Sequence, residues 1–372
     1  MVAGLVLAGA MLGTEPVQDR GLNQLAERIR QESGLPNLYV TLVYNGKTYA
    51  AAAGFQDPGR KRPATTRDRY KVGSVTKPLT SLLTLRLAAS GKLKLDDPII
   101  KHFPEAAQSA NPQFLKATIQ NLLTHSSGLS RPGTGPHRGR RQNEALEVYG
   151  TAARLECVPK WLAERPAAEL GHYSYSNNGY CILGSLCERV GKASFSALMK
   201  SEVFGPLGMT GADVGMPSSE SSPEHPWHFP IKDGVAGEPF PSTPKHDQGP
   251  TAEPQGGIHW DSESAGRLIL EIIRMSRGTS QFLPREYAKG VLTHQLGLPS
   301  RTLAWESWQE GRFGIALNHN GANADHRGLW NFTHTRILPS AGFGMSVTTT
   351  AGYTGDFVKL SSRFQEFVLG LP

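Results

Sequence analysis

Cysteine is scarce in this sequence, with only Cys157, Cys181 and Cys187 in a chain of 372 residues. So few cysteines cannot form the dense disulfide framework that stabilises many small secreted domains. None of them belongs to a C-x-x-C pair, so we expect no cysteine-based zinc site. A single disulfide that leaves one thiol free is compatible with the count.

Long hydrophobic runs are also lacking. The apolar run at residues 2–12 has the length of the hydrophobic part of a signal peptide and falls far short of the ~20 residues of a membrane-spanning helix. No Lys or Arg precedes it. We therefore expect no integral membrane span and treat 1–17 as a possible signal or targeting segment. A periplasmic or secreted location is expected, with the cytoplasm as the alternative.

Charge is sparse too, since charged residues make up 19% of the chain and Lys+Arg exceed Asp+Glu by 39 to 32. An excess of +7 in a chain of this length is only mildly basic and is not the footprint of a nucleic-acid-binding protein. With 38% hydrophobic residues the chain is too apolar to be a disordered polyelectrolyte. It should fold into two or three domains, at roughly 100–200 residues each.

Proline and glycine, by contrast, are abundant. Nine of the 26 prolines fall in residues 217–254, together with six acidic and two basic side chains. Proline removes a backbone donor and fixes φ, so we expect no regular element to persist there. We interpret 217–254 as a long surface excursion that influences substrate selection.

The hydrophobic pattern places strands near both ends of the chain and helices in the middle. Apolar spacing predicts a helix over 19–33, a hairpin of strands 38–44 and 47–54 joined by Asn45-Gly46, and a largely buried helix over 74–90. Further helices are predicted at 119–123, 143–162, 178–190, 195–203, 262–275 and 356–369, and further strands at 313–319, 330–338 and 344–350.

This order predicts an α/β (α+β) fold, in which an antiparallel sheet is flanked by helices and carries an inserted all-α domain. The sheet domain would be discontinuous, from 18–78 and 255–372. The helical domain would cover 79–254, with the proline-rich excursion at its end. The pattern does not specify an oligomeric state.

A nucleophile–base pair is suggested by S-x-x-K, which occurs at Ser74–Lys77 and again at Ser242–Lys245. At the start of a helix, residues three apart share a face, so the Lys77 amine can reach the Ser74 hydroxyl and take its proton. Gly73 allows a tight turn into that helix. The second pair lies in the proline-rich excursion and lacks such a helix. The alternative for the first pair is an N-capping serine followed by a solvent-facing lysine.

Two further motifs follow in order. Tyr175-Ser176-Asn177 is the single Y-x-N of the chain, although Asn178 offers a register shifted by one residue. Alone, it would read as an Asn cap beside a packed tyrosine. His319-Asn320-Gly321 follows the strand-like run that ends at Asn318, with Ala322 next.

Together, S-x-x-K on a buried helix, Y-x-N about 100 residues later and H-x-G on a late strand resemble the serine β-lactamase and penicillin-binding (DD-peptidase) superfamily. With a tyrosine in the second motif, the sequence resembles one branch of this superfamily. This branch holds class C β-lactamases, DD-carboxypeptidases and β-lactamase-like carboxylesterases. Stretches that also resemble this branch are 91–98, 118–129, 206–210 and 256–258. The resemblance runs from about residue 38 to the C-terminal helix and implies the β-lactamase/DD-peptidase-like fold.

The resemblance implies roles for the motif residues. Ser74 would be the nucleophile and Lys77 the group that activates it. Tyr175 would share or relay the proton, acting first as base and then as acid towards the leaving group, with its phenol pKa lowered by a nearby ammonium. Asn177 would hold Lys77 and Tyr175 and bond the acyl substituent. His319 would orient Tyr175 or a substrate carboxylate.

The backbone N–H groups of Ser74 and Ala322 would form the oxyanion hole, and Asn320 and Gly321 would line the substrate edge. Asn320 departs from the usual Thr, Ser or Gly of the third motif. No metal or organic cofactor is implied.

The expected function is a serine hydrolase that cleaves a small-molecule ester, amide or peptide through an acyl-enzyme. His319 in place of lysine favours ester or peptide substrates over β-lactams. Among the activities we expect a carboxylesterase-like one first, with DD-carboxypeptidase and then β-lactamase activity on the same site as alternatives. A non-catalytic binding or scaffold protein that keeps the fold is the alternative from another class, with Asn320 as its best support.

Other candidates carry weaker signals. His125 is attractive as a base, but the resemblance makes its stretch structural. His225 and His228 form H-x-x-H in a loop without a fixed helix face, so a metal site is not expected. Arg131, Arg138, Arg140 and Arg141 read as a solvated run that could line a cleft for acidic substrates.

Overall fold

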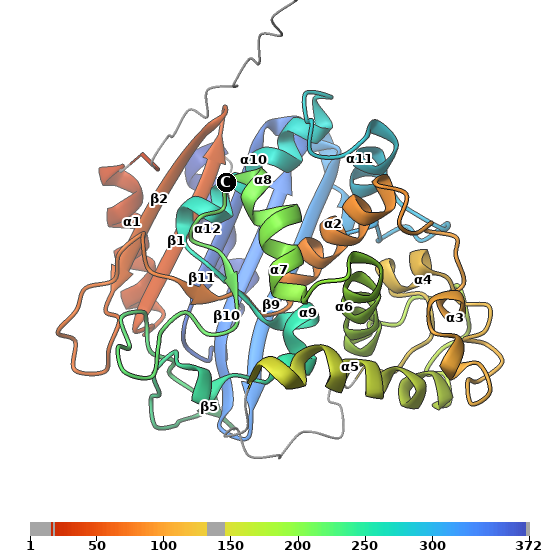
Figure 1. Ribbon diagram of the computed structural model, residues 1–372. Helices are drawn as coiled ribbons and strands as arrows, with labels where there is room; N and C mark the ends of the chain where they lie inside the picture. The colour runs from red at the N-terminus through yellow and green to blue at the C-terminus, as the bar shows by residue number, and fades with distance from the viewer. Residues whose placement is uncertain (1–15, 18, 132–145, 370–372) are drawn as a thin grey trace, which may run out of the picture.

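The computed structural model describes residues 16–17, 19–131 and 146–369 and is built around an antiparallel sheet to which both halves of the chain contribute (Figure 1). The order is β2–β1–β11–β10, followed by β9 and β8, while β5 and β6 pair with the same edge of β10 as β11, beyond the end of β11. The strands are β1 (Asn37–Tyr44), β2 (Lys47–Gly54), β5 (Ile231–Lys232), β6 (Val235–Ala236), β8 (Glu306–Gln309), β9 (Ile315–Asp325), β10 (Gly328–Leu338) and β11 (Phe343–Thr349). A small second sheet has the order β3 (Tyr70–Lys71), β7 (Ile258–Trp260) and β4 (Asp213–Val214).

The first hairpin forms where the sequence predicts it. Asn45 and Gly46 adopt φ values of 48° and 77°, the left-handed conformations that a tight two-residue hairpin needs. β1 and β2 then pair in register from Tyr44↔Lys47 to Asn37↔Gly54.

Both faces of the sheet are covered by helices (Figure 1). Leu38, Val40 and Leu42 point to the layer of α1 (Arg20–Glu32) and α12 (Phe357–Leu369). The alternate residues Tyr39 and Val43 belong to the larger core on the opposite face. Strand alternation therefore separates two hydrophobic cores across one sheet. The larger core includes α10 (Ser262–Ser276).

The helical part packs beside the sheet around α2 (Thr76–Ala89), nearly all of whose side chains are buried. The other helices are α3 (Ile99–His102), α4 (Ile119–Leu123), α5 (Leu146–Ala163), α6 (Asn177–Gly191), α7 (Phe195–Met199), α8 (Gly205–Leu207), α9 (Glu253–Gly256) and α11 (Arg285–Leu292). The helices expected at 119–123, 178–190 and 195–203 are confirmed, whereas α11 and β8 were not predicted. Residues 143–145 of the helix expected at 143–162 lie outside the described residues, and the proposed domain division stays a prediction.

Two expectations about the later chain are wrong. β9 does not end near residue 319 but pairs with β10 as far as Asp325↔Gly328, so the His319-Asn320-Gly321 motif lies inside a strand. The proline-rich excursion also holds regular structure, since β5 and β6 form a hairpin across Asp233-Gly234, whose φ values are 52° and 79°. Asp-Gly is a hairpin signal in its own right, and the prolines of the excursion lie outside the paired residues.

The three cysteines are buried free thiols, so the single disulfide left open by the sequence does not form here. Among the helices described, none is long and apolar enough to cross a membrane. The targeting segment predicted for 1–17 lies almost entirely outside the described residues.

Candidate active site

Ser74 sits on a tight turn between β3 and α2. It is the middle residue of the 3-10 turn Gly73–Val75, and α2 begins at Thr76 with Val75 as its N-cap. The N-capping alternative for Ser74 is therefore wrong. Gly73 has a φ of +55°, and a Cβ built there would lie 2.5 Å from the backbone nitrogen of Ala322. The predicted need for glycine is confirmed.

The amine of Lys77 is fully buried against Ser74. Its Nζ donates to Ser74 Oγ at 3.1 Å, to the Gln255 carbonyl at 2.8 Å and to Gln255 Oε1 at 3.3 Å. Burial lowers the pKa of Lys77 to about 7, and the charge of Arg131 acts in the same direction. Across the described chain no carboxylate pairs with this amine. A neutral amine is thus accessible near pH 7, which is what a proton acceptor for a serine requires.

Tyr175 lies beside this pair. The Lys77 Nζ lies 5.0 Å from the centroid of its ring, and the neighbouring Ser74 hydroxyl favours the ionised form of its phenol. Burial raises the pKa of Tyr175 to about 12. The expectation of a lowered phenol pKa is therefore wrong, because the cost of burying a phenolate outweighs the attraction of nearby cations. Tyr175 keeps its proton at neutral pH.

The asparagines of the second motif begin α6. Ser176 caps this helix by accepting a hydrogen bond from the Gly179 amide at 3.0 Å. Asn178 donates through Nδ2 to Ser130 Oγ at 2.9 Å. The Oδ1 of Asn177 is buried without a hydrogen-bond partner among the described residues. Asn177 is not among the described acceptors of the Lys77 amine, although the sequence assigned it that contact.

The third motif brings β9 against the Ser74 turn. A Cβ added to Gly321 would lie 1.9 Å from the Val72 carbonyl oxygen and 3.1 Å from the Ser74 nitrogen. Glycine at 73 and at 321 thus lets the backbones of Ser74 and Ala322 approach each other closely. Two amides brought together in this way suit an oxyanion between them.

His319 is a buried neutral side chain 6.5 Å from Tyr175, measured between ring centroids. Its Nδ1 lies 2.8 Å from the Asn320 carbonyl oxygen, which can only accept, so Nδ1 carries the proton and Nε2 keeps its lone pair. Burial lowers the pKa of His319 to about 3, and Lys77 adds to the effect. The side chain of Asn320 meets His334 on β10, whose Nδ1 lies 2.7 Å from Asn320 Oδ1.

His125 supports the tyrosine loop. Its ring stacks on Tyr175 with centroids 4.4 Å apart, and its Nδ1 accepts a hydrogen bond from the Ser176 amide at 3.0 Å. Burial holds the pKa of His125 well below its usual value. These contacts match the structural role that the resemblance implies for its stretch.

The remaining histidine motif and the second S-x-x-K have structural contacts. His228 Nε2 lies 3.2 Å from Ser242 Oγ, so this hydroxyl is engaged by the histidine. Lys245 is exposed. His225 accepts a hydrogen bond from the Arg69 amide at 3.3 Å. Within the described ranges no three His, Cys, Asp or Glu side chains group as metal ligands do.

Two arginines flank the tyrosine. Exposed Arg131 lies 5.8 Å from the centroid of the Tyr175 ring. Buried Arg301, which the sequence analysis missed, donates to the Tyr173 hydroxyl and to Glu306 Oε1, the latter at 3.0 Å. The other three arginines of the predicted run, Arg138, Arg140 and Arg141, lie outside the described residues.

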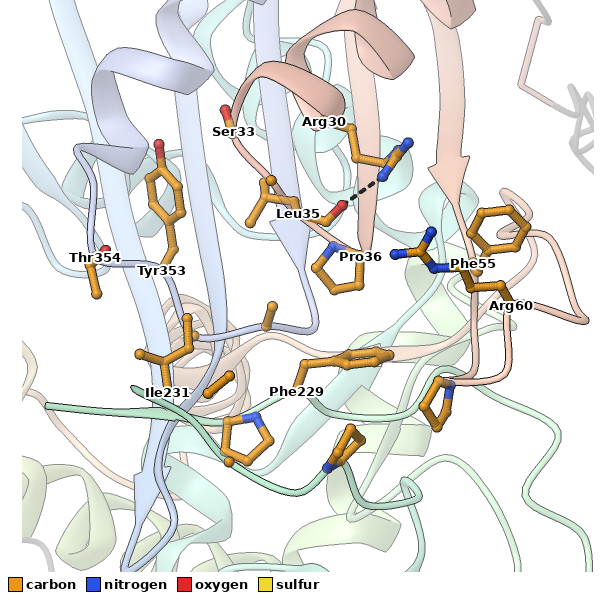
Figure 2. Close-up of a pocket in the computed structure, with 18 of the residues that line it drawn as sticks. Arg30, Ser33, Leu35, Pro36, Phe55, Arg60, Phe229, Ile231, Tyr353 and Thr354 are labelled. Carbon is orange, nitrogen blue, oxygen red and sulfur yellow. Dashed lines mark hydrogen bonds between the residues drawn. The ribbon is translucent and has the colours of Figure 1, made fainter. Parts of the chain in front are cut away.

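A separate cavity of about 620 Å³ opens at the end of the sheet beside α1. Figure 2 shows its apolar lining, which includes Pro36, Phe55 and Phe229, and the hydrogen bond from Arg30 to the Leu35 carbonyl. The described residues around it include no histidine, cysteine or lysine and none of the predicted site residues. The predicted site residues thus lie away from this cavity.

Comparison with known proteins gives a family match over most of the chain. A protein-family model described as Beta-lactamase matches residues 22–366. Protein flp of Staphylococcus aureus strain N315 is 30% identical over 190 residues, which cover 51% of this chain and 37% of that protein. The chain thus matches little more than a third of the length of this curated relative.

Solved structures share the fold. D-alanine carboxypeptidase AmpC from Burkholderia cenocepacia superposes with a TM-score of 0.71 and 20% identity over 92% of this chain and 98% of that chain. A D-stereospecific amidohydrolase from Streptomyces sp. gives a TM-score of 0.70 and 20% identity over 92% and 97%. These likenesses confirm the predicted fold class.

Proposed function

The chain belongs to the β-lactamase family of serine hydrolases, and from this premise we propose that it cleaves ester or amide bonds through an acyl-enzyme on Ser74. The observation that carries the proposal is the buried Lys77 amine, which donates to Ser74 Oγ and has a pKa of about 7. A lysine that served only as a surface charge would be solvated and protonated.

In the first step, neutral Lys77 accepts the Ser74 proton while Oγ forms a bond to the substrate carbonyl carbon. The carbonyl oxygen then carries a negative charge that the amides of Ser74 and Ala322 stabilise. Each such donor contributes about 3 kcal/mol in the transition state.

In the second step, the bond to the leaving group breaks and the leaving oxygen or nitrogen receives a proton. Tyr175 is protonated at neutral pH and lies beside Lys77, so in this mechanism it donates this proton and is reprotonated from the Lys77 ammonium. Water then attacks the acyl-enzyme, and the same groups work in reverse to release the acid.

For the substrate we favour a carboxylesterase-like activity. His319 is neutral at physiological pH, so it offers no positive charge to the carboxylate of a β-lactam or peptide. Its Nε2 lone pair can instead accept a hydrogen bond from a neutral group.

One observation supports a second candidate, DD-carboxypeptidase activity. Arg131 lies near Tyr175 and is exposed, and no described carboxylate pairs with it. An exposed guanidinium at this point can bind the terminal carboxylate of a peptide. The solved D-alanine carboxypeptidase with the same fold is consistent with this alternative.

A small panel tests the proposal: short p-nitrophenyl esters, a D-alanyl-D-alanine peptide and nitrocefin, each with the wild type and Ser74→Ala. We expect ester hydrolysis by the wild type, little turnover of nitrocefin and loss of all activity in Ser74→Ala. Preferential peptide cleavage would support the second candidate, and faster nitrocefin turnover would refute the ester assignment. If neither protein hydrolyses anything, the scaffold alternative gains support.

A further inference from the structure

The amine of Lys77 is held by a residue that no sequence motif identifies. Two of its three described acceptors belong to Gln255, the backbone carbonyl at 2.8 Å and the side-chain Oε1 at 3.3 Å. Asn177 Oδ1, by contrast, is buried without a described partner. We propose that Gln255 is a positioning residue that holds Lys77 on Ser74, in the role the motif pattern gives to Asn177.

This proposal rests on the proposed function, and it requires that Gln255 be fixed in place. Gln255 lies on the short helix α9, whose backbone is bound from three other elements. The Pro254 carbonyl accepts from Thr80 Oγ1 of α2 at 2.7 Å, the Gly256 carbonyl from Asn323 Nδ2 of β9 at 3.2 Å, and the Gly257 carbonyl from Lys71 Nζ of β3 at 2.8 Å.

Side-chain contacts with α5 and α6 also hold α9 in place. Pro254 packs so closely on α6 that a Cβ added to Gly184 would lie 2.1 Å from the proline ring. Glu253 accepts a hydrogen bond at 2.9 Å from Arg154 of α5, and this arginine is itself buried and paired with Glu188 of α6. Contacts with α2, α5, α6, β3 and β9 thus hold α9 in place, so the side-chain amide of Gln255 is fixed where it reaches Lys77.

The charges around Lys77 make this contact measurable. The titratable and charged groups that face or influence the amine are Tyr175, Tyr180, Cys181, Arg131, His125 and His319. None of them is a carboxylate. A glutamate at 255 would therefore introduce the single acidic group in contact with the amine among the described residues, and an opposite charge at this distance raises a lysine pKa by about 1–3 units.

The experiment measures the pH dependence of the second-order rate of Ser74 labelling by a fluorophosphonate between pH 5 and 9.5. The variants are Gln255→Glu, Gln255→Met and the matched control Gln24→Glu, which makes the same charge change at an exposed position on α1. For the wild type we expect a rate that rises with pH around a midpoint near 7, since His319 and Tyr175 titrate outside this range.

Gln255→Glu should raise this midpoint by at least about one unit. Gln255→Met, which removes the side-chain acceptor but keeps the backbone carbonyl and the length of the side chain, should lower it by up to about one unit. Gln24→Glu should leave it unchanged. If Gln255 had only a structural role, its two variants would not shift the midpoint of the labelling rate in opposite directions.

The outcomes test the role of Gln255 separately from the proposed function. If the wild type is not labelled at Ser74, the proposed function fails. If it is labelled but the midpoints of the Gln255 variants match the wild type, the role of Gln255 is overturned while the proposed function stands. Thermal unfolding identifies a variant that does not fold, and if Gln255→Glu fails, the midpoint of Gln255→Met decides alone.

Discussion

At the scale of single residues, Lys77 combines two conflicting demands. Its amine must lose a proton near neutral pH to activate Ser74, and the fold achieves this by burying the amine away from carboxylates. Burial of an amine that becomes charged below a pH of about 7 opposes folding. The residue that makes the site reactive should therefore also make the protein less stable.

Replacement of this amine should consequently stabilise the protein. A lysine in an unfolded chain has a pKa of about 10.4. Between pH 7 and that value the unfolded chain binds a proton that folded wild type lacks, so wild-type stability rises with pH over this window. Lys77→Met should thus raise the free energy of unfolding by about 2–3 kcal/mol at pH 6.5, after allowance for its lost hydrogen bonds. The gain should vanish near pH 10.5.

Urea unfolding of Lys77→Met and wild type at pH 6.5 and pH 10 measures this difference. The exposed lysine variant Lys359→Met serves as a matched control and should show no pH-dependent difference from wild type. A Lys77→Met protein that is less stable than wild type at pH 6.5 would contradict the account of Lys77 as a buried amine without a counter-ion.

The contacts of Lys77 differ in how far they can be predicted from the sequence. The pairing of Ser74 with Lys77 depends on a local spacing of three residues, which helix geometry converts directly into contact. Gln255 contacts the same amine from 178 positions away along the chain, and no local pattern encodes that approach. The pKa of Tyr175 was wrongly predicted for a similar reason, because burial depends on the whole environment.

At the scale of elements, the site depends on how closely β9 packs on the Ser74 turn. Glycine at positions 73 and 321 allows this approach, since either Cβ would come within 2.5 Å of the opposite backbone. The strand carries Ala322, and the turn carries Ser74, so their separation sets the geometry of the two amides.

Gly321→Ala should separate these elements. A Cβ that would lie 1.9 Å from the Val72 carbonyl oxygen forces a shift of more than about 1 Å, and such a shift lowers rates by about 100-fold. We expect this loss in kcat/KM for ester hydrolysis, with the circular dichroism spectrum retained. Gly59→Ala, in an exposed turn, is the matched control and should keep wild-type activity. A wild-type rate for Gly321→Ala would show that the contact does not shape the site.

Sequence periodicity predicted the larger elements but not all of their limits. α1, α2, α6, α10 and the first hairpin carry strong local signals, and they form where expected. β9 continues beyond its apolar run because pairing with β10, rather than side-chain hydrophobicity, stabilises residues 320–325. β8 and α11 are short and lack a strong pattern, so their formation depends on tertiary contacts.

At the scale of the whole molecule, the site joins four distant segments. They are the 3-10 turn Gly73–Val75, the loop that carries Tyr175, the helix α9 and the strand β9. The sequence indicated three of these segments through the order of their motifs, and it placed the strands of the sheet at both ends of the chain. It did not indicate α9, which spans the end of the proline-rich excursion and contributes Gln255 to the site.

The central claim is that Ser74 is the nucleophile, and covalent labelling tests it most directly. The full chain is treated with a fluorophosphonate at pH 8, and the adduct is located by peptide mass spectrometry. The account predicts one adduct, on the peptide that contains Ser74, and its loss in both Ser74→Ala and Lys77→Met. An unlabelled wild type, or an adduct on another serine such as Ser242 with Ser74 unmodified, would contradict it.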